Sequence, residues 1–428
     1  MTARQTIRRR ECEVGDDWPD AVLPLLRRIH AARGAHHARQ AQPRLADLHA
    51  PDSLGGMVAA CDLLVDAITA NRHIVVVGDF DCDGATACAV GVRGLRMLGA
   101  GNVDYAVPNR MVHGYGLSPA LVEELAVMQP DLLVTVDHGI ACNAGITAAK
   151  ARGWQVLVTD HHLPGHQLPP ADAIVNPNLD GDAFPSKMLA GVGVMFYVLL
   201  ALRRRLRDAG HFSRSGMPGG EPDLSTLLDL VAVGTVADLV QLDANNRALV
   251  GAGLRRLQAG QGCEGLKALL VISGCNASTL NCTDIGFRIA PRLNAAGRLE
   301  DMALGIECLL TDDASHAREI ARTLDGINAE RRGLQQEMVD DAQALLEGIE
   351  IEGVLPAALC LFDAQWHPGV VGLVASKMKE KTHRPTIAFA PAQPGSASLR
   401  ASLRGSARSI PGFHIRDALA AVNAMNPG

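Results

Sequence analysis

The sequence is poor in aromatic residues and has no excess of positive charge. Phe, Trp and Tyr together make up 3% of the 428 residues, and the formal net charge is −6. Nucleic-acid-binding proteins usually carry a basic surface and aromatic rings that stack on bases, so composition alone argues against such a partner. Arginine-rich stretches at 8–10, 203–205 and 400–408 are the places where a local basic patch could still form.

Features of secreted and membrane proteins are also missing. The ten cysteines include no C-x-x-C pair, which argues against a zinc site and a disulfide framework. The first eleven residues carry four arginines and Glu11, unlike a secretory signal. The uncharged run at 188–202 is short for a membrane span and predicts a buried helix. We therefore expect a reducing, cytoplasmic location and no membrane partner.

Short apolar segments alternate with helix-like segments from about residue 72. The expected strands are 73–77, 132–136, 156–159 and 230–236, and the helices between them include 86–98 and 119–128. The first three strands are nearly continuous in apolar residues, as buried parallel strands are. This alternation predicts an α/β fold with a parallel sheet.

The whole chain is expected to contain two domains. A polar helical arm at 1–50 precedes a domain at 51–313, whose α/β core covers about 72–240 and whose helical part covers 241–313. Residues 314–350 contain few helix breakers and have apolar positions at helical spacing, which predicts a connecting helix. A smaller α/β domain follows at 351–428 and ends with a helix at 415–425.

Acidic and histidine residues follow the expected strands. They are Asp79, Asp81 and Asp83 after the first strand, Asp137 after the second, Asp160, His161 and His162 after the third, and Asp238 after the fourth. Ligands bind beyond the carboxyl ends of strands in an open parallel sheet, so we expect these side chains to converge. If the backbone stays extended at 79–83, its three carboxylates point to one side. His138 could simply occupy a turn and is not included.

Clustered carboxylates predict bound metal. They repel one another and raise one another's pKa unless a cation lies between them. Carboxylates with imidazole suit Mn²⁺, or Mg²⁺, and two such ions can hydrolyse a phosphate ester. A lone aspartate after a strand is usually a helix cap or a turn residue, but four acid-bearing strand ends favour a metal site.

These motifs resemble the DHH phosphoesterase superfamily and, within it, the RecJ-type single-strand exonucleases. Asp160-His161-His162 is similar to the motif that names the superfamily, and 79–84, 137–139 and 234–238 match other motifs. Stretches that resemble the RecJ type lie at 108–117, 175–179, 185–194, 291–302 and 405–409. The resemblance runs from about residue 7 to 428 and departs from the usual pattern at 111–113.

The resemblance implies a role for each acidic or histidine residue. Asp79, Asp81 and Asp137 would hold one ion, and Asp83, Asp137, His161 and Asp238 would hold the other. Asp137 would be shared by both ions. His162 would lie beside the scissile phosphate, and Asp160 would orient its neighbours.

The resemblance also implies contacts to the substrate. Phosphate contacts are expected from Gly405, Ser406, Arg408, Ser409, Arg110, Arg292, Asn294 and Arg298, and a base would stack on Tyr115. From the residues alone, 405–409 could be a surface turn, Arg292 and Arg298 could form structural salt bridges, and Tyr115 could be buried.

The function implied is a metal-dependent 5′-to-3′ exonuclease on single-stranded DNA that releases mononucleotides in recombination and repair. We expect a monomer that works with a single-strand-binding protein and a helicase. The alternatives are a DHH phosphodiesterase for short oligonucleotides or cyclic dinucleotides, and a non-catalytic DNA-binding scaffold, which should have lost ligands. RecJ-type chains continue past residue 428 with the rest of a DHHA1-like domain and an OB-fold. The resemblance therefore implies a C-terminally truncated DHHA1-like domain.

Overall fold

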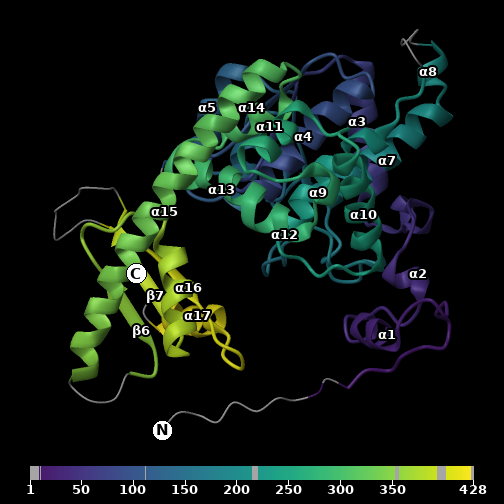
Figure 1. The fold of residues 1–428 in the computed structure, drawn as a ribbon. Coiled ribbons are helices and arrows are strands. Elements are labelled where there is room, and N and C mark those ends of the chain that lie inside the picture. Colours follow the sequence, from purple (N-terminus) through teal and green to yellow (C-terminus); the bar gives the residue numbers. More distant parts are fainter. Residues whose placement is uncertain are drawn as a thin grey trace. The chain divides into compact units, whose positions relative to one another are not determined.

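The computed structural model describes residues 9, 11–110, 112–214, 220–351, 356–392 and 402–425. The chain divides into two compact units, each with its own sheet (Figure 1). Unit 1 comprises Met1–Asn294 and Met302–Arg322, and unit 2 comprises Ala295–Asp301 and Thr323–Gly428. Among the helices of the described residues, none is long and apolar enough to cross a membrane.

Unit 1 is built on a five-stranded parallel sheet with the order β2-β1-β3-β4-β5. The strands are β1 Ile74–Val77, β2 Val103–Ala106, β3 Leu132–Val136, β4 Gln155–Thr159 and β5 Ala173–Val175. β1 and β3 are buried along their whole length, as their continuous apolar sequence predicted. The parallel sheet and its three central strands are therefore confirmed.

Helices cover both faces of this sheet. They include α3 Met57–Thr69, α4 Cys82–Met97, α5 Pro119–Leu125 with the 3₁₀ turn η3 Ala126–Met128, α6 Asn143–Ala151 and α7 Gly191–Asp208. One apolar cluster joins α5 and α6 to the side of the sheet that carries Val75 and Leu133. α4 and α7 pack against each other and contact the sheet. The uncharged run at 188–202 thus forms most of a buried helix, as expected.

The segment predicted as a fourth strand is a helix. Residues 230–236 lie within α9 Leu228–Ala237, which packs against α4, α7 and α10 Ala244–Gln258. Every residue of α9 except Ala237 is buried, so its sequence is mostly apolar and lacks the helical alternation of polar and apolar positions. A short, almost wholly apolar run is compatible with a buried strand or with a buried helix. Residues 230–236 are part of a helix that is surrounded by other helices.

Shorter elements complete unit 1. The helices and turns are α8 His211–Arg214, η2 Pro51–Ser53, η4 Leu224–Leu227, α11 Glu264–Ile272, η5 Ala277–Thr279, α12 Cys282–Asp284, the π-helix η6 Ile285–Ile289 and α14 Ala303–Leu310. α13 Ala290–Leu299 begins in unit 1 and ends in unit 2. Among the described residues of the arm expected to be helical over 1–50, the helical segments are α1 Pro24–Ala31, α2 Ala38–Ala41 and η1 Leu45–Asp47. Part of the arm, residues 1–8 and 10, lies outside the described residues.

Unit 2 contains most of α15 Ala314–Ile351, which matches the predicted connecting helix. Its sheet has the order β6-β7-β8, with β6 Leu359–Phe362 parallel to β7 Thr386–Pro391 and β8 Leu403–Arg408 antiparallel. α16 Val371–Thr382 and part of α15 share an apolar core with Trp366. α17 Ile415–Met425 has the bounds predicted for the last helix.

The contact between α9 and α10 yields a stability prediction. A Cβ added to Gly253 would overlap the carbonyl oxygen of Leu228, whereas one added to Gly251 would meet only a flexible atom of Arg255 at 3.5 Å. Gly253→Ala should therefore destabilise the chain by about 1–3 kcal/mol through overpacking. The matched change Gly251→Ala should be neutral or stabilising, because alanine favours helix. Thermal unfolding of both variants measures this, and equal melting temperatures would contradict the packing described.

Candidate metal centre

The loop after β1 turns into a helix between two of its aspartates. Asp79 follows the strand, and Asp81 caps α4 by accepting a hydrogen bond from the N–H of Gly84 at 3.0 Å. Asp83 lies in the first helical turn, so the extended backbone expected through this segment is wrong. The three carboxylates still belong to neighbouring groups of possible ligands, because only a four-residue loop separates the strand from the helix. Gly84 permits this turn, since a Cβ there would lie 2.6 Å from the backbone of Asp79.

Asp83 is held by the start of α7. Its two oxygens accept the N–H groups of Gly191, at 2.6 Å, and Val192, at 3.0 Å. The N-terminus of a helix favours negative charge, so α7 fixes this carboxylate in position. Burial and the neighbouring charge of Asp238 nevertheless raise the pKa of Asp83 to about 7.

Asp137 follows β3 in a left-handed backbone conformation, with φ of 64°. Its N–H donates to the carbonyl oxygen of Thr159 at 3.0 Å, which ties it to the end of β4. A Cβ on Gly191 would lie 2.5 Å from the side chain of Asp137, so only glycine fits at the start of α7. Unusual backbone conformations of this kind concentrate at functional sites.

Asp160 organises the two histidines that follow it. One of its oxygens accepts the N–H groups of His161 and His162 and the Nδ1–H of His162, the last at 2.8 Å. The other oxygen accepts the N–H of Ile140 at 2.9 Å. Burial alone would raise the pKa of Asp160, but the bonds from His162 outweigh it and lower that pKa. The same bond is the main cause that raises the pKa of His162 to about 9.

Two asparagines that the sequence prediction did not include hold the same loop. The Nδ2 groups of Asn178 and Asn176 donate to the carbonyl oxygens of His161, at 2.5 Å, and His162, at 2.9 Å. Both asparagines belong to the stretch at 175–179 that supported the resemblance, and this was the only signal for them in the sequence.

The carboxylates and imidazoles converge into three overlapping groups that could hold a cation. They are Asp79 with Asp81 and Asp137; Asp83 with His161 and Asp238; and Asp137 with His161 and His162. Within each group, the possible ligand atoms lie within 4.8 Å of one another. Asp238 reaches the cluster from the C-terminal end of α9, where its N–H donates to Gly234, and not from a strand as predicted.

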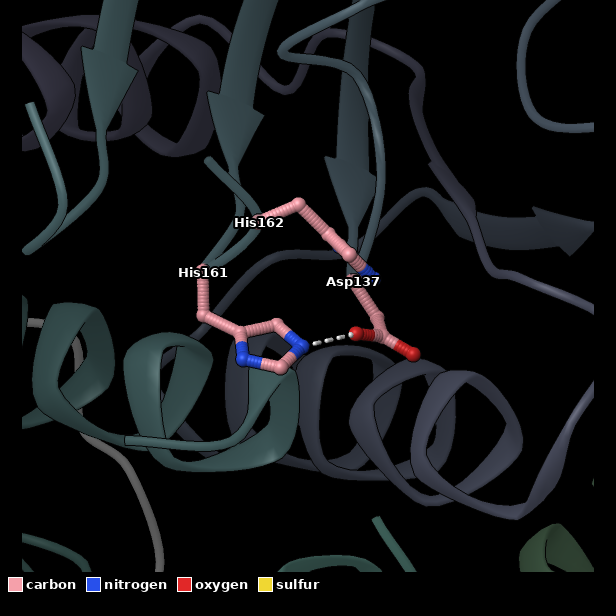
Figure 2. Close-up of side chains that lie close together, drawn as sticks. All are labelled: Asp137, His161 and His162. Atoms are coloured by element: carbon pink, nitrogen blue, oxygen red, sulfur yellow. Dashed lines mark ion pairs between the residues drawn. The ribbon is translucent and has the colours of Figure 1, made fainter. Parts of the chain in front are cut away.

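Two buried atoms in this cluster are positioned as ligands. Figure 2 shows the imidazole of His161 facing the carboxylate of Asp137, and Nε2 lies 3.1 Å from Oδ1. Neither atom makes a hydrogen bond within the part of the chain that is described, although both are buried. An unpaired buried polar atom is costly, and a shared cation would satisfy both. The donor set therefore fits a metal ion.

Electrostatic repulsion within the cluster supports the same interpretation. Burial, followed by the charge of Asp81, raises the pKa of Asp79 to about 8 and that of Asp238 to about 7. Burial, followed by the charge of Asp83, raises the pKa of Asp137 well above its ordinary value. Carboxylates with such pKa values cannot all be ionised at neutral pH unless a positive charge offsets them.

One arginine and two aromatic side chains border the cluster. The guanidinium carbon of Arg110 lies 4.8 Å from the ring centre of Phe80, between Asp79 and Asp81 in the chain. The ring of Tyr115 meets Phe80 edge-on at 5.9 Å and His162 at 6.2 Å. Tyr115 is 48% exposed, so it is not the buried tyrosine considered as an alternative.

Asn294 and Arg292 of α13 have structural partners. The Oδ1 of Asn294 accepts the N–H of Cys82 at 2.8 Å and so fastens the loop between Asp81 and Asp83. The guanidinium of Arg292 donates to the carbonyl oxygen of Arg288, one turn earlier in the helix. The expected phosphate contacts of both residues stay predictions.

The remaining phosphate candidates lie in unit 2. Gly405, Ser406 and Arg408 belong to β8, so the alternative of a surface turn at 405–409 is wrong for these three residues. Arg408 donates to the hydroxyls of Ser376 and Ser406, each at 2.9 Å, and Ser409 donates to the carbonyl oxygen of Phe413. The last candidate, Arg298, donates to the carbonyl oxygen of Gly369 at 3.2 Å.

His138, which the sequence analysis left out of the ligand set, is buried away from it. Its Nε2 lies 3.0 Å from the carbonyl oxygen of Val77, and its Nδ1 faces the thiol of Cys142. Burial lowers the pKa of His138 to about 4, so the ring is neutral at physiological pH. Its contacts are those of a core residue.

Comparisons with known proteins agree with this geometry. The model of the DHH family, N-terminal domain, matches residues 73–235, and the DHHA1 domain model matches residues 354–428. The single-stranded-DNA-specific exonuclease RecJ of Dickeya dadantii is 49% identical over 421 residues, which are 98% of this chain and 72% of that protein. The chain belongs to the RecJ family. RecJ of Escherichia coli is 47% identical over 429 residues, covering 100% of this chain and 73% of that protein.

Solved RecJ structures share the fold. The crystal structure of RecJ from Thermus thermophilus in complex with Mn²⁺ matches with a TM-score of 0.74 and 34% identity. The match covers 92% of this chain and 53% of that chain, so this RecJ-family chain spans about half of the crystallised protein. A second RecJ structure, bound to manganese, matches with a TM-score of 0.70 and 37% identity over 86% of this chain and 85% of that one.

The raised pKa of Asp137 predicts how the stability of the metal-free chain depends on pH. The folded chain holds a proton on this carboxyl that the unfolded chain releases above about pH 4, so the stability contributed by this group falls as pH rises. Metal-free Asp137→Asn should therefore melt higher than wild type at pH 8, by on the order of a few degrees. The difference should shrink at pH 5. Thermal unfolding in chelator at both values measures this, and a difference that is independent of pH would contradict it.

Proposed function

We propose that this RecJ-family chain is a metal-dependent exonuclease that degrades single-stranded DNA from the 5′ end and releases mononucleotides. The observation that carries the proposal is the convergence of the three ligand groups, two of which share Asp137. In this proposal Asp79, Asp81 and Asp137 hold one ion, and Asp83, Asp137, His161 and Asp238 hold the other. Two ions in such a site activate water and stabilise the leaving oxygen of a phosphodiester.

Mn²⁺ or Mg²⁺ fits the donor set. The ligand atoms are carboxylate oxygens and one imidazole nitrogen, and these suit hard divalent cations. The RecJ structures of Thermus thermophilus contain Mn²⁺ in one case and Mg²⁺ in another.

His162 is assigned to the phosphate and not to a metal. Its Nδ1 is engaged by Asp160, and its side chain is 46% exposed, which leaves Nε2 available to a substrate. The bond to Asp160 favours the protonated ring, which can donate a charge-assisted hydrogen bond to a phosphate oxygen. Asp160 thus acts through His162 as a positioning residue.

The phosphate contacts and the partners are proposed with the same function. Arg110 and Tyr115 border the cluster and would contact the strand near the cut, and Gly405, Ser406, Arg408 and Ser409 would bind phosphates from unit 2. A monomer working with a single-strand-binding protein and a helicase in recombination and repair follows from the family. Ten cysteines without a disulfide support a reducing, cytoplasmic compartment.

The proposal predicts the effect of removing the shared ligand. Asp137→Ala deprives both ions of a carboxylate, so cleavage should fall by more than the roughly 10²–10³-fold typical of one lost transition-state contact. Folding should survive, because carboxylate repulsion is relieved. The assay follows single strands labelled at either end, with Mn²⁺, Mg²⁺ and chelator compared. Retention of a tenth of wild-type turnover would contradict the site, and product released first from the 3′ end would contradict the polarity.

Arg408 provides a second test, directed at binding. Arg408→Ala should weaken affinity for single strands and flatten its dependence on salt, because fewer counterions are released. Turnover at saturating DNA should suffer less than in Asp137→Ala. The control is Lys377→Ala, which removes an exposed charge from the neighbouring α16. An affinity and salt slope equal to those of the control would assign Arg408 to the structure of β8.

A further inference from the structure

Leu239 occupies an unfavourable position directly after the proposed ligand Asp238. It follows the C-cap of α9 with φ of 62°, where glycine is the usual residue because other side chains are strained there. Its side chain is 86% exposed, so it contributes little burial in return for this strain. A strained backbone that carries an exposed apolar side chain at the edge of a site indicates a role in binding.

Phe287 is a second exposed apolar side chain near the same end of α9. It lies in the π-helix η6 and is 80% exposed, whereas Ile285 and Ile289 on either side are completely buried. The two isoleucines therefore anchor η6 while Phe287 stays in solvent. Single π-helical turns within α-helical segments are rare and are frequent at functional sites.

Leu239 directly follows Asp238, and the segment that carries Phe287 packs against α9, the helix that Asp238 ends. η6 packs against α9, and a Cβ on Gly286 would lie 4.0 Å from Val236, whose carbonyl oxygen accepts the N–H of Leu239. η6 continues into α13, and Asn294 of α13 accepts the backbone N–H of Cys82, which lies between Asp81 and Asp83. The segment that carries Phe287 is thus connected to the metal cluster in two ways. It packs against α9, and it continues into the helix that binds Cys82.

The surroundings fit a nucleic-acid strand better than a protein partner. Arg288 and Arg292 follow Phe287 on the same helical segment, and Arg288 forms an ion pair with Asp284 at 3.8 Å, so two basic groups stand against one acid. Exposed aromatic rings combined with basic groups are how proteins hold single strands without reading their sequence. Among the described residues of unit 1, Phe287 at 80% and Tyr115 at 48% are the most exposed aromatic residues, in a chain with few of them.

We propose that Leu239 and Phe287 form a base-packing surface that holds a nucleobase of the substrate strand beside Asp238. The inference rests on the proposed function and adds residues to it. A base packed there fixes the position of its nucleotide relative to the metal ligands, so both residues position the strand for the cut and take no part in the chemical step.

The first experiment compares substitutions on this surface with a matched control. Phe287→Ala and Leu239→Gly should each raise KM for single strands roughly tenfold in Mn²⁺, the size expected when one stacked base is lost. Phe287→Tyr, which keeps an aromatic face, should raise KM less than Phe287→Ala does. The control Val271→Ala removes an equally apolar side chain, 77% exposed, on α11. Leu239→Gly should not lower the melting temperature, because glycine relieves the strained backbone, so a higher KM in that variant cannot come from unfolding.

The second experiment locates the base. A series of strands, each with one abasic nucleotide at a successive position from the 5′ end, is compared for the wild type and Phe287→Ala. The wild type should lose affinity at one position, and the variant should be insensitive at that same position. Identical abasic profiles for the two proteins, or variants that match Val271→Ala, would overturn this inference while leaving the proposed function standing. A wild type that cleaves no single strand would overturn the function itself.

Discussion

The structure depends on burying several carboxylates close together, which is unfavourable unless other interactions hold them in position. Asp83 is the clearest case, because its charge lies at the N-terminus of α7 and accepts two backbone N–H groups. In the proposed site, a bound cation offsets the electrostatic repulsion that remains between the carboxylates. Close approach of the helices requires glycine at the contact points. Added Cβ atoms on Gly84, Gly191 and Gly234 would overlap Asp79, Asp137 and Thr86.

The sequence predicts the sheet well because burial on both faces leaves a simple pattern. β1, β3 and β4 are nearly continuous apolar runs, whereas the edge strand β2 is partly exposed and β5 has only three residues, so both escaped detection. The wrong prediction of a strand at 230–236 has the same physical cause as the correct predictions of β1, β3 and β4. A helix that is buried on all sides has the same kind of apolar sequence as a buried strand, and only its neighbours in the fold distinguish the two.

The convergence of the acidic and histidine side chains was predictable for a different reason. The carboxyl ends of parallel strands lie at the same edge of the sheet, whatever path the chain takes between the strands. Asp79, Asp137 and His161 could therefore be grouped without coordinates. Asp238 was grouped correctly for a wrong reason, since it follows a helix. The partners of Asn294, Asn176 and Asn178 could not be predicted, because each binds a backbone group that tertiary packing brings near it.

The positive φ of Asp137 limits how this position can change during evolution. In that backbone conformation glycine, asparagine and aspartate are tolerated, whereas longer or branched side chains are strained. Glutamate would keep the charge but lose the backbone compatibility, and asparagine would keep the backbone but lose the charge. If Asp137 is the shared ligand proposed above, descendants of this chain can lose activity and keep their fold by a single step at this position, but they have no equally easy step to another acidic residue.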